Sequence, residues 1–195
     1  MQFRLLQLTW LRCSYALFLF NLGCLGQAQS DVASRSISLR RLAHNVPKKA
    51  QKLYFDAKCA WERDDTAAAV VFLENAIAVD DQFFEATNNL GVMCLRQGRL
   101  NDALVMFRRA TQIDGSDSQA ELNLAYVLLM LSRFSEAEDA ARASLRGDPK
   151  AGWARICLAI SLLEQGKKRA EAIFHLKQAS DELEEARKLL KMVGQ

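Results

Sequence analysis

The sequence has little of what an all-β protein or an enzyme depends on. Its 195 residues include nine glycines and two prolines, too few for the many tight turns of an all-β fold. His44 and His175 are the two histidines, and neither a paired nucleophile and base nor a glycine-rich phosphate loop is present. Half of the residues are apolar, which excludes a disordered chain. These features predict an all-α protein that is not an enzyme and needs no cofactor.

Basic residues are not concentrated in the main part of the chain. The formal net charge is +3, yet residues 31–49 alone carry +4 and residues 50–195 carry −3. A nucleic-acid surface needs clustered lysine and arginine to displace counterions from phosphates. We therefore exclude nucleic acid as a partner, and nothing in the sequence indicates a small-molecule substrate.

The amino terminus has the three parts of a secretory signal peptide. Arg4 and Arg12 precede 13 uncharged residues, 13–25, and small residues follow at Gly26 and Ala28. Cleavage after Ala28 is the simplest prediction, with a cut after Ser30 as the alternative. The apolar run is shorter than the roughly 20 residues that a membrane span needs. Residues 1–28 are thus predicted to direct export, with the mature protein secreted or periplasmic.

Two alternatives involve the envelope. An uncleaved signal would act as an anchor, and Leu22-Gly23-Cys24 resembles part of a bacterial lipoprotein signal, although Asn21 stands where leucine is usual. Lipidation at Cys24 would make the protein an anchored structural or assembly subunit. Membrane contact is expected only in these two cases. The other widely spaced cysteines predict neither a disulfide framework nor a metal site; they are Cys59, Cys94 and Cys157, Cys13 being lost with the signal.

The chain repeats itself every 34 residues over four copies. One series of small residues recurs at this interval, and a second does so with a final step of 35; they are Ala57, Gly91, Ala125 and Ala159, then Ala69, Ala103, Ala137 and Ala172. In the second copy, apolar residues take up a 3.6-residue period on both sides of Gln97-Gly98-Arg99. Each copy is therefore predicted to be two helices joined by a short turn.

Particular residues mark the turns, the joints and the close contacts. Four residues are expected to follow the first helix of each copy, where positive φ is needed; they are Asp64, Gly98, Ser132 and Gly166. The joints between copies are expected at Asp80-Asp81, Asp114-Gly115-Ser116 and Asp148-Pro149. Gly91 is predicted to face Ala103, which lets the two helices approach closely.

Leu90-Gly91, Ala103, Phe107, Ala110 and Asp114 together are similar to the tetratricopeptide repeat signature. The resemblance covers about residues 50–183, in four copies in register. It implies a right-handed α-solenoid of about four helix-turn-helix repeats over residues 50–180, whose first helices line a concave groove. The family resemblance also implies a clamp for a terminal carboxylate. Asn89 matches one of the clamp positions, but Gln119 and Asn123 stand where basic residues are expected in the next copy. An apolar or aromatic segment is therefore the expected ligand.

Twelve residues are predicted to face this groove and bind a protein or peptide partner. They are Tyr54, Lys58 and Trp61 in the first copy, Asn88, Asn89, Val92 and Leu95 in the second, Asn123, Tyr126 and Met130 in the third, and Trp153 and Ile156 in the fourth. Aromatic residues are common interface anchors, and Asn89 and Asn123 occupy the same repeat position. The alternative is that some of these side chains belong to the core and that the two asparagines bridge neighbouring helices.

The segments on either side of the repeats differ in character. Residues 29–49 form a basic lead-in to which the sequence assigns no structure. Residues 181–195 form an amphipathic segment that begins with acids, and its apolar stripe predicts a C-terminal helix that caps the last repeat. The rival interpretation is a helix through which the protein oligomerises. The sequence as a whole predicts an exported, non-catalytic repeat scaffold.

Overall fold

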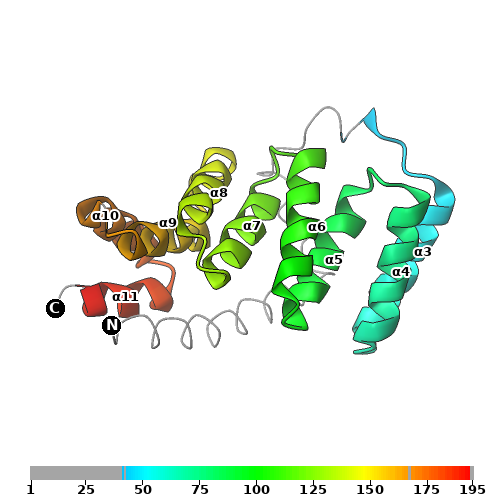
Figure 1. Cartoon of the computed structure of the whole chain (residues 1–195), viewed down its shortest axis with the longest axis horizontal. Coiled ribbons are helices and arrows are strands. Elements are labelled where there is room, and N and C mark those ends of the chain that lie inside the picture. The colour runs from blue at the N-terminus through cyan, green and yellow to red at the C-terminus, as the bar shows by residue number, and fades with distance from the viewer. Residues whose placement is uncertain (1–40, 42, 167, 194–195) are drawn as a thin grey trace.

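The computed structural model describes residues 41, 43–166 and 168–193, and every regular element in this part of the chain is an α-helix. Of the nine helices bounded within residues 43–193, eight follow one another as antiparallel pairs, and the pairs stack side by side along the array (Figure 1). The pairs are α3 (Lys48–Glu62) with α4 (Thr66–Val79), α5 (Phe84–Arg96) with α6 (Leu100–Ile113), α7 (Ser118–Met130) with α8 (Phe134–Gly147), and α9 (Gly152–Glu164) with α10 (Arg169–Ala179). The ninth, α11 (Glu184–Val193), packs on α10. The prediction of an all-α solenoid is confirmed.

The turn inside each pair begins with the same backbone conformation, although the fourth turn is longer and also has positive φ, 50°, at Lys168. The residue expected after each first helix has positive φ, with values of 60° at Asp64, 73° at Gly98, 58° at Ser132 and 66° at Gly166. After α5, the amide of Gly98 donates to the carbonyl of Leu95 at 3.0 Å, and that of Arg99 donates to Cys94 at 2.9 Å. These bonds satisfy carbonyls that the helix end leaves open. The predicted turn positions are therefore correct in all four pairs.

An aspartate ends each of the second helices α4, α6 and α8 and forms the joint to the next pair. In each case Oδ1 of the aspartate accepts a hydrogen bond from the backbone amide two residues later. The N–O distances are 3.1 Å for Gln82 to Asp80, 3.0 Å for Ser116 to Asp114 and 2.9 Å for Lys150 to Asp148. Short aspartate side chains favour such local bonds and so reverse the chain direction. The predicted joints are confirmed.

The close approach within the second pair differs in one detail from the prediction. A Cβ atom added to Gly91 would lie 2.6 Å from Cε1 and 2.8 Å from Cδ1 of Phe107. The ring of Phe107, rather than Ala103, is thus the nearest side chain to Gly91. Both Phe107 and Ala103 are fully buried. The ring edge formed by Cδ1, Cε1 and Cζ lies against the bare glycine and fills the space between α5 and α6.

The first helices lie on the inner side of the array. Helix α7 contacts both α5 and α9 directly, whereas the second helices of neighbouring pairs approach one another less closely. An array whose first helices converge must curve toward them. The outer side is linked by ion pairs between second helices, such as Arg108 with Glu136 at 2.6 Å and Arg142 with Glu171 at 2.7 Å.

Helix α11 lies against the last pair. It begins at Glu184, after a turn over residues 180–182, and buries Ala186, Leu189 and Val193. Leu183, the residue before α11, lies close to the start of α9, since a Cβ atom on Gly152 would be 2.8 Å from Cδ1 of Leu183. Among the residues that the structure describes, no helix has the length and apolar character to span a membrane. The predicted signal peptide, residues 1–28, and Cys24 lie outside the described residues.

Candidate functional site

The twelve residues predicted to line the groove, here called the groove face, differ in burial along the array. On α3 and α5, Tyr54, Lys58, Trp61, Asn88, Asn89 and Val92 are all partly exposed. At the equivalent positions of α7 and α9, the side chains are nearly all buried. In the described structure, the accessible part of the groove face therefore belongs mainly to the first two pairs.

Two hydrogen bonds link successive first helices at the same repeat positions. Nδ2 of Asn89 donates to the hydroxyl of Tyr54 at 2.9 Å, and Nδ2 of Asn123 donates to Oδ1 of Asn88 at 3.1 Å. Both bonds join residues 35 apart in the sequence. Nε2 of Gln119 also donates to Oδ1 of Asn123 at 3.2 Å. The asparagines thus bridge neighbouring helices, as the alternative interpretation of the sequence expected.

Tyr54 keeps its proton at any physiological pH. Burial and, to a smaller extent, the carboxylate of Glu85 raise the pKa of Tyr54 to about 12, although the hydrogen bond from Asn89 and the charge of Arg41 act to lower it. The ring packs at a tilt against Phe83, with the centroids 5.2 Å apart. Because the hydroxyl accepts from Asn89, its own proton remains able to donate to an acceptor on a ligand.

Trp61 and Lys58 form the polar and aromatic end of the accessible part. The guanidinium carbon of Arg96 lies 4.2 Å from the Trp61 ring centroid, a cation–π contact that holds the indole in place. A narrow cleft of about 10 Å³ lies between Tyr54, Lys58, Trp61 and Asn89. This volume is close to the lower limit for one water molecule. A partner would therefore lie across these side chains and would not insert a group between them.

Four of the predicted groove residues are not accessible, which corrects the prediction for them. Asn123 is 1% exposed, Ile156 2%, Tyr126 4% and Leu95 7%. Asn123 is occupied by its bonds to Asn88 and Gln119, and the other three are members of the continuous hydrophobic core. Met130 and Trp153 are partly buried and pack against that core. The repeat register shows which way a side chain points but not whether that side is covered.

Arg41 of the basic lead-in forms a contact that the sequence pattern did not predict. Arg41 donates from Nε and Nη2 to Oε1 of Glu85, at 3.1 and 2.6 Å, and from Nη1 to Oδ2 of Asp117 at 2.9 Å. Nη1 also lies 3.6 Å from Oδ2 of Asp114. The guanidinium carbon is 3.9 Å from the centroid of the Phe84 ring. Phe84, Glu85, Asp114 and Asp117 are called the arginine site below.

The helix cap at Asp117 orients one of the carboxylates of this site toward Arg41. Asp117 is the N-cap of α7, where Oδ1 accepts from the amides of Gln119 at 3.1 Å and Ala120 at 2.9 Å, so that Oδ2 is left for Arg41. Burial alone would lower the pKa of Arg41, but hydrogen bonding and charge attraction from Glu85 and Asp117 raise the pKa above its ordinary value. The guanidinium is therefore permanently charged.

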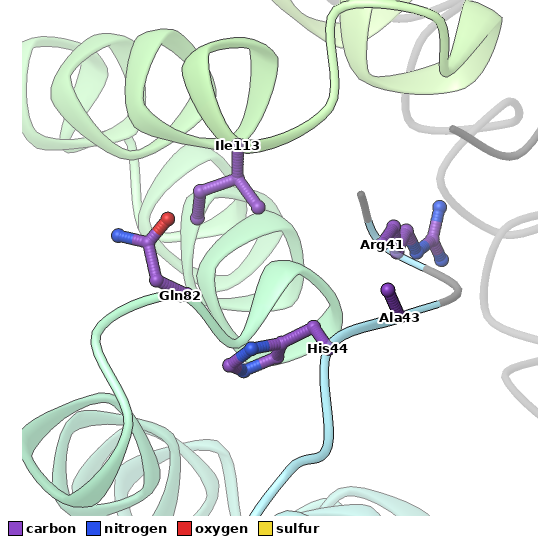
Figure 2. A pocket seen from close by; sticks show the side chains of 5 residues that line it. All are labelled: Arg41, Ala43, His44, Gln82 and Ile113. Atoms are coloured by element: carbon purple, nitrogen blue, oxygen red, sulfur yellow. The ribbon is translucent and has the colours of Figure 1, made fainter. Parts of the chain in front are cut away.

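His44 forms the second polar contact of the lead-in, and a cavity lies beside it. Nε2 of His44 is 2.8 Å from Oδ2 of Asp80. The cavity holds about 330 Å³ and is lined by Arg41, Ala43, His44, Gln82 and Ile113. Figure 2 shows the three lead-in residues with Gln82, from the first joint, and Ile113, from the end of α6, across the cavity from them. The described residues of the lead-in thus lie over the joints, with open space between them and Gln82 and Ile113.

Two features of the sequence could have indicated this contact. The net charge of residues 31–49 is opposite to that of residues 50–195. Aspartates also recur at the joints with the 34-residue period, at Asp80, Asp114 and Asp148. Neither feature identifies Arg41 among the basic residues of the lead-in, because the pairing spans 76 residues between Arg41 and Asp117.

Cys94 and Cys157 behave as apolar core residues. Cys94 and Cys157 are buried, and burial raises the pKa of both thiols, that of Cys157 to about 12. Neither is a thiolate at neutral pH, so neither is activated as a nucleophile. The residues that the structure describes hold no group of three or more histidine, cysteine or acidic side chains suited to a metal ion.

Comparisons with known proteins agree on the fold. Two models of the tetratricopeptide repeat match residues 56–118 and 94–155, and together they span just over half of the 195 residues. No curated protein sequence matches the chain. The matching family typically forms non-catalytic scaffolds that bind protein partners.

Several solved structures are similar to the chain. MamA (residues 41 to the end) from Desulfovibrio magneticus RS-1 is 16% identical with a TM-score of 0.70, over 76% of this chain and 85% of that one. A tetratricopeptide repeat protein from Parabacteroides merdae is 18% identical with a TM-score of 0.66, over 75% and 59%. The Arabidopsis OM64 repeat domain is 20% identical with a TM-score of 0.54, over 57% and 93%. At these identities the likeness shows the fold alone.

Proposed function

Because the chain belongs to the tetratricopeptide repeat family, we propose that it is an exported scaffold that binds a protein segment on the groove face of α3 and α5 and catalyses no reaction. One observation carries the proposal. The first two pairs keep aromatic, amide and basic side chains partly exposed at positions where α7 and α9 bury theirs. These side chains lie on the inner side of the curve, where an extended partner can contact both helices at once.

The chemistry of this surface favours an apolar or aromatic segment. Trp61 offers a ring held by Arg96, and Val92 lies on the next first helix. The amide of Asn89 and the hydroxyl of Tyr54 can bond the backbone of such a segment. Large aromatic side chains dominate the binding energy of most interfaces, so Trp61 is the expected anchor.

A photo-crosslinking experiment tests the surface even while the partner is unidentified. A photoreactive phenylalanine derivative replaces Lys58 on the groove face in one full-length variant and Val105 in another. Val105 is the matched control because it is 58% exposed and lies on the second helix α6. We expect a specific protein adduct from position 58 and none from position 105. An adduct from position 105 alone would place the binding surface on the outer side.

A second variant tests the anchor. In the position-58 protein, Trp61→Ala should reduce the adduct yield, because loss of a central aromatic anchor weakens binding by about tenfold or more. Val71→Ala, at a site that is 54% exposed on α4, should leave the yield unchanged. An unchanged yield for Trp61→Ala, with the melting temperature preserved, would remove Trp61 from the proposed interface.

We also propose that residues 1–28 direct export and are removed. The proposal is supported by the charge and apolar pattern of the sequence. Mass spectrometry of the mature amino terminus tests it, with Gln29 or Asp31 expected as the first residue. A lipid-modified Cys24 would instead support the alternative of an envelope-anchored assembly subunit, and an intact Met1 would contradict cleavage.

A further inference from the structure

The described lead-in, Arg41 with residues 43–47, is called the strap because it crosses the joints of the first three pairs. It is held by charged and polar groups and has little apolar packing. Ala43, Asn45 and Pro47 are exposed, and of the described strap residues only Val46 packs against the core. Segments with few buried apolar contacts open at low free-energy cost. Detachment of the strap therefore costs mainly the contacts of Arg41 and His44, and an arginine from another segment could replace the first of these.

The arginine site, in contrast, is built into the array. The side chain of Asp114 is fully buried and that of Asp117 is 10% exposed, while Phe84 is 4% exposed and lies in a small apolar cluster with Ala110. Its carboxylates come from two different pairs. If Arg41 left, the carboxylate of Asp117, whose side chain is 10% exposed, would lose the counter-charge that Arg41 supplies, which is unfavourable. The site therefore requires a cation.

The geometry selects a guanidinium among the possible cations. Glu85 and Asp117 accept from different edges of the planar Arg41 group, and Phe84 lies against its face. A lysine ammonium cannot form this set of planar and stacked contacts. The adjoining cavity of about 330 Å³ leaves space through which a second side chain can approach.

We propose that Phe84, Glu85, Asp114 and Asp117 form a binding site for an arginine-bearing segment of a partner protein, which Arg41 of the strap occupies in the free chain. A partner arginine displaces Arg41 and releases the strap from the joints. This site is distinct from the groove face, because none of its four residues is a groove-face residue. Failure of one proposal therefore leaves the other standing.

Direct binding of a labelled peptide tests the site. The probe is a fluorescein-labelled, amidated peptide with the sequence of residues 41–47, Arg-Leu-Ala-His-Asn-Val-Pro, and the matched control peptide has lysine in place of arginine. In wild type, Arg41 competes from a short tether at an effective concentration on the order of millimolar. We expect full-length Arg41→Ala to bind the arginine peptide at least about tenfold more tightly than wild type does. It should also bind this peptide at least about tenfold more tightly than the lysine peptide.

The receptor control removes the acceptors while preserving the helix cap. Adding Glu85→Gln and Asp117→Asn to Arg41→Ala should abolish saturable binding, and asparagine still caps α7. Equal binding of the two peptides, equal binding to wild type and Arg41→Ala, or binding that survives the triple change would each overturn the proposal.

Hydrogen exchange on wild type provides a measurement that does not depend on the folding of any variant. Excess arginine peptide should accelerate amide exchange in residues 43–46, because the displaced strap leaves the joints. The lysine peptide should not accelerate it. The proposal is wrong if the exchange rates of these amides stay unchanged at peptide concentrations that saturate Arg41→Ala. If that variant does not fold, unchanged exchange rates at the highest attainable peptide concentration would equally overturn the proposal.

Discussion

Gly91→Ala should destabilise the protein although alanine is the better helix former. In a helix interior this change alone would stabilise by about 0.5 to 1 kcal/mol. At this position, however, the new Cβ atom would lie 2.6, 2.8 and 3.1 Å from three atoms of the Phe107 ring. Phe107 is fully buried, so the ring cannot move aside without disturbing its neighbours. Overpacking of this kind costs about 1 to 3 kcal/mol, and contacts as short as 2.6 Å place the cost in the upper half of that range, so the net loss is about 1 to 2.5 kcal/mol.

The other copies suggest how the loss can be reversed. Where alanine stands at the position of Gly91, the residue at the position of Phe107 is smaller, as in Ala57 with Leu73 and Ala159 with Leu176. Phe107→Leu alone should leave a cavity at Gly91 and lower stability. The double variant Gly91→Ala/Phe107→Leu should be more stable than the sum of the two losses predicts, by about 1 kcal/mol or more.

Urea unfolding followed by circular dichroism measures all four proteins of this cycle. Gly98→Ala is the control for the backbone, because nothing lies within 4 Å of its added Cβ atom, while its φ of 73° makes any side chain unfavourable. It should cost about 1 kcal/mol without any coupling to Phe107→Leu. A Gly91→Ala protein as stable as wild type, or strictly additive losses in the cycle, would refute the contact between glycine and ring as the reason for Gly91.

Three further predictions concern burial. Burial raises the pKa of Glu121 from 4.5 to about 7, although Arg146 lowers it. The folded state therefore holds the proton more tightly than the unfolded chain, so the stability of wild type should fall as pH rises from about 4.5 to about 7. Thermal melts should show Glu121→Gln to be more stable than wild type by about 1 to 2 kcal/mol at pH 8 and equally stable at pH 4. Asn123→Ala should lower the free energy of unfolding in urea by about 1 to 3 kcal/mol, because it removes a buried amide and its bond to Asn88. Asn89→Ala, at a partly exposed site, should lower it by less than about 1 kcal/mol. Equal losses of stability in the two variants would contradict the difference in burial. Removal of residues 181–195 should expose the apolar face of the last pair and cause self-association in size-exclusion chromatography, and a monomeric truncation with an unchanged melting temperature would show that α11 is not a cap.

The repeat and its turns could be predicted from the sequence alone because they depend on local backbone chemistry. A 34-residue period of small residues indicates the helix pairs, and positive φ at Gly98 or Asp64 follows from the need to end a helix within one turn. Asp80 and Asp114 mark the joints for the same reason, since a short side chain bonds the amide two residues later. All of these interactions join residues that are close in the chain, so the sequence contains them directly.

Which groove residues are accessible, and what the lead-in does, were decided only by the tertiary structure. The register gave Lys58 and Tyr126 the same position in their helices, yet Lys58 is partly exposed and Tyr126 is 4% exposed. Arg41 meets Glu85 and Asp117 across 44 and 76 residues. The period shows which side of a helix a residue occupies, but burial and long-range ion pairs depend on how the stacked pairs are rotated and which segments return to cover them. That rotation is set by summed packing over whole interfaces, and no single stretch of sequence contains it.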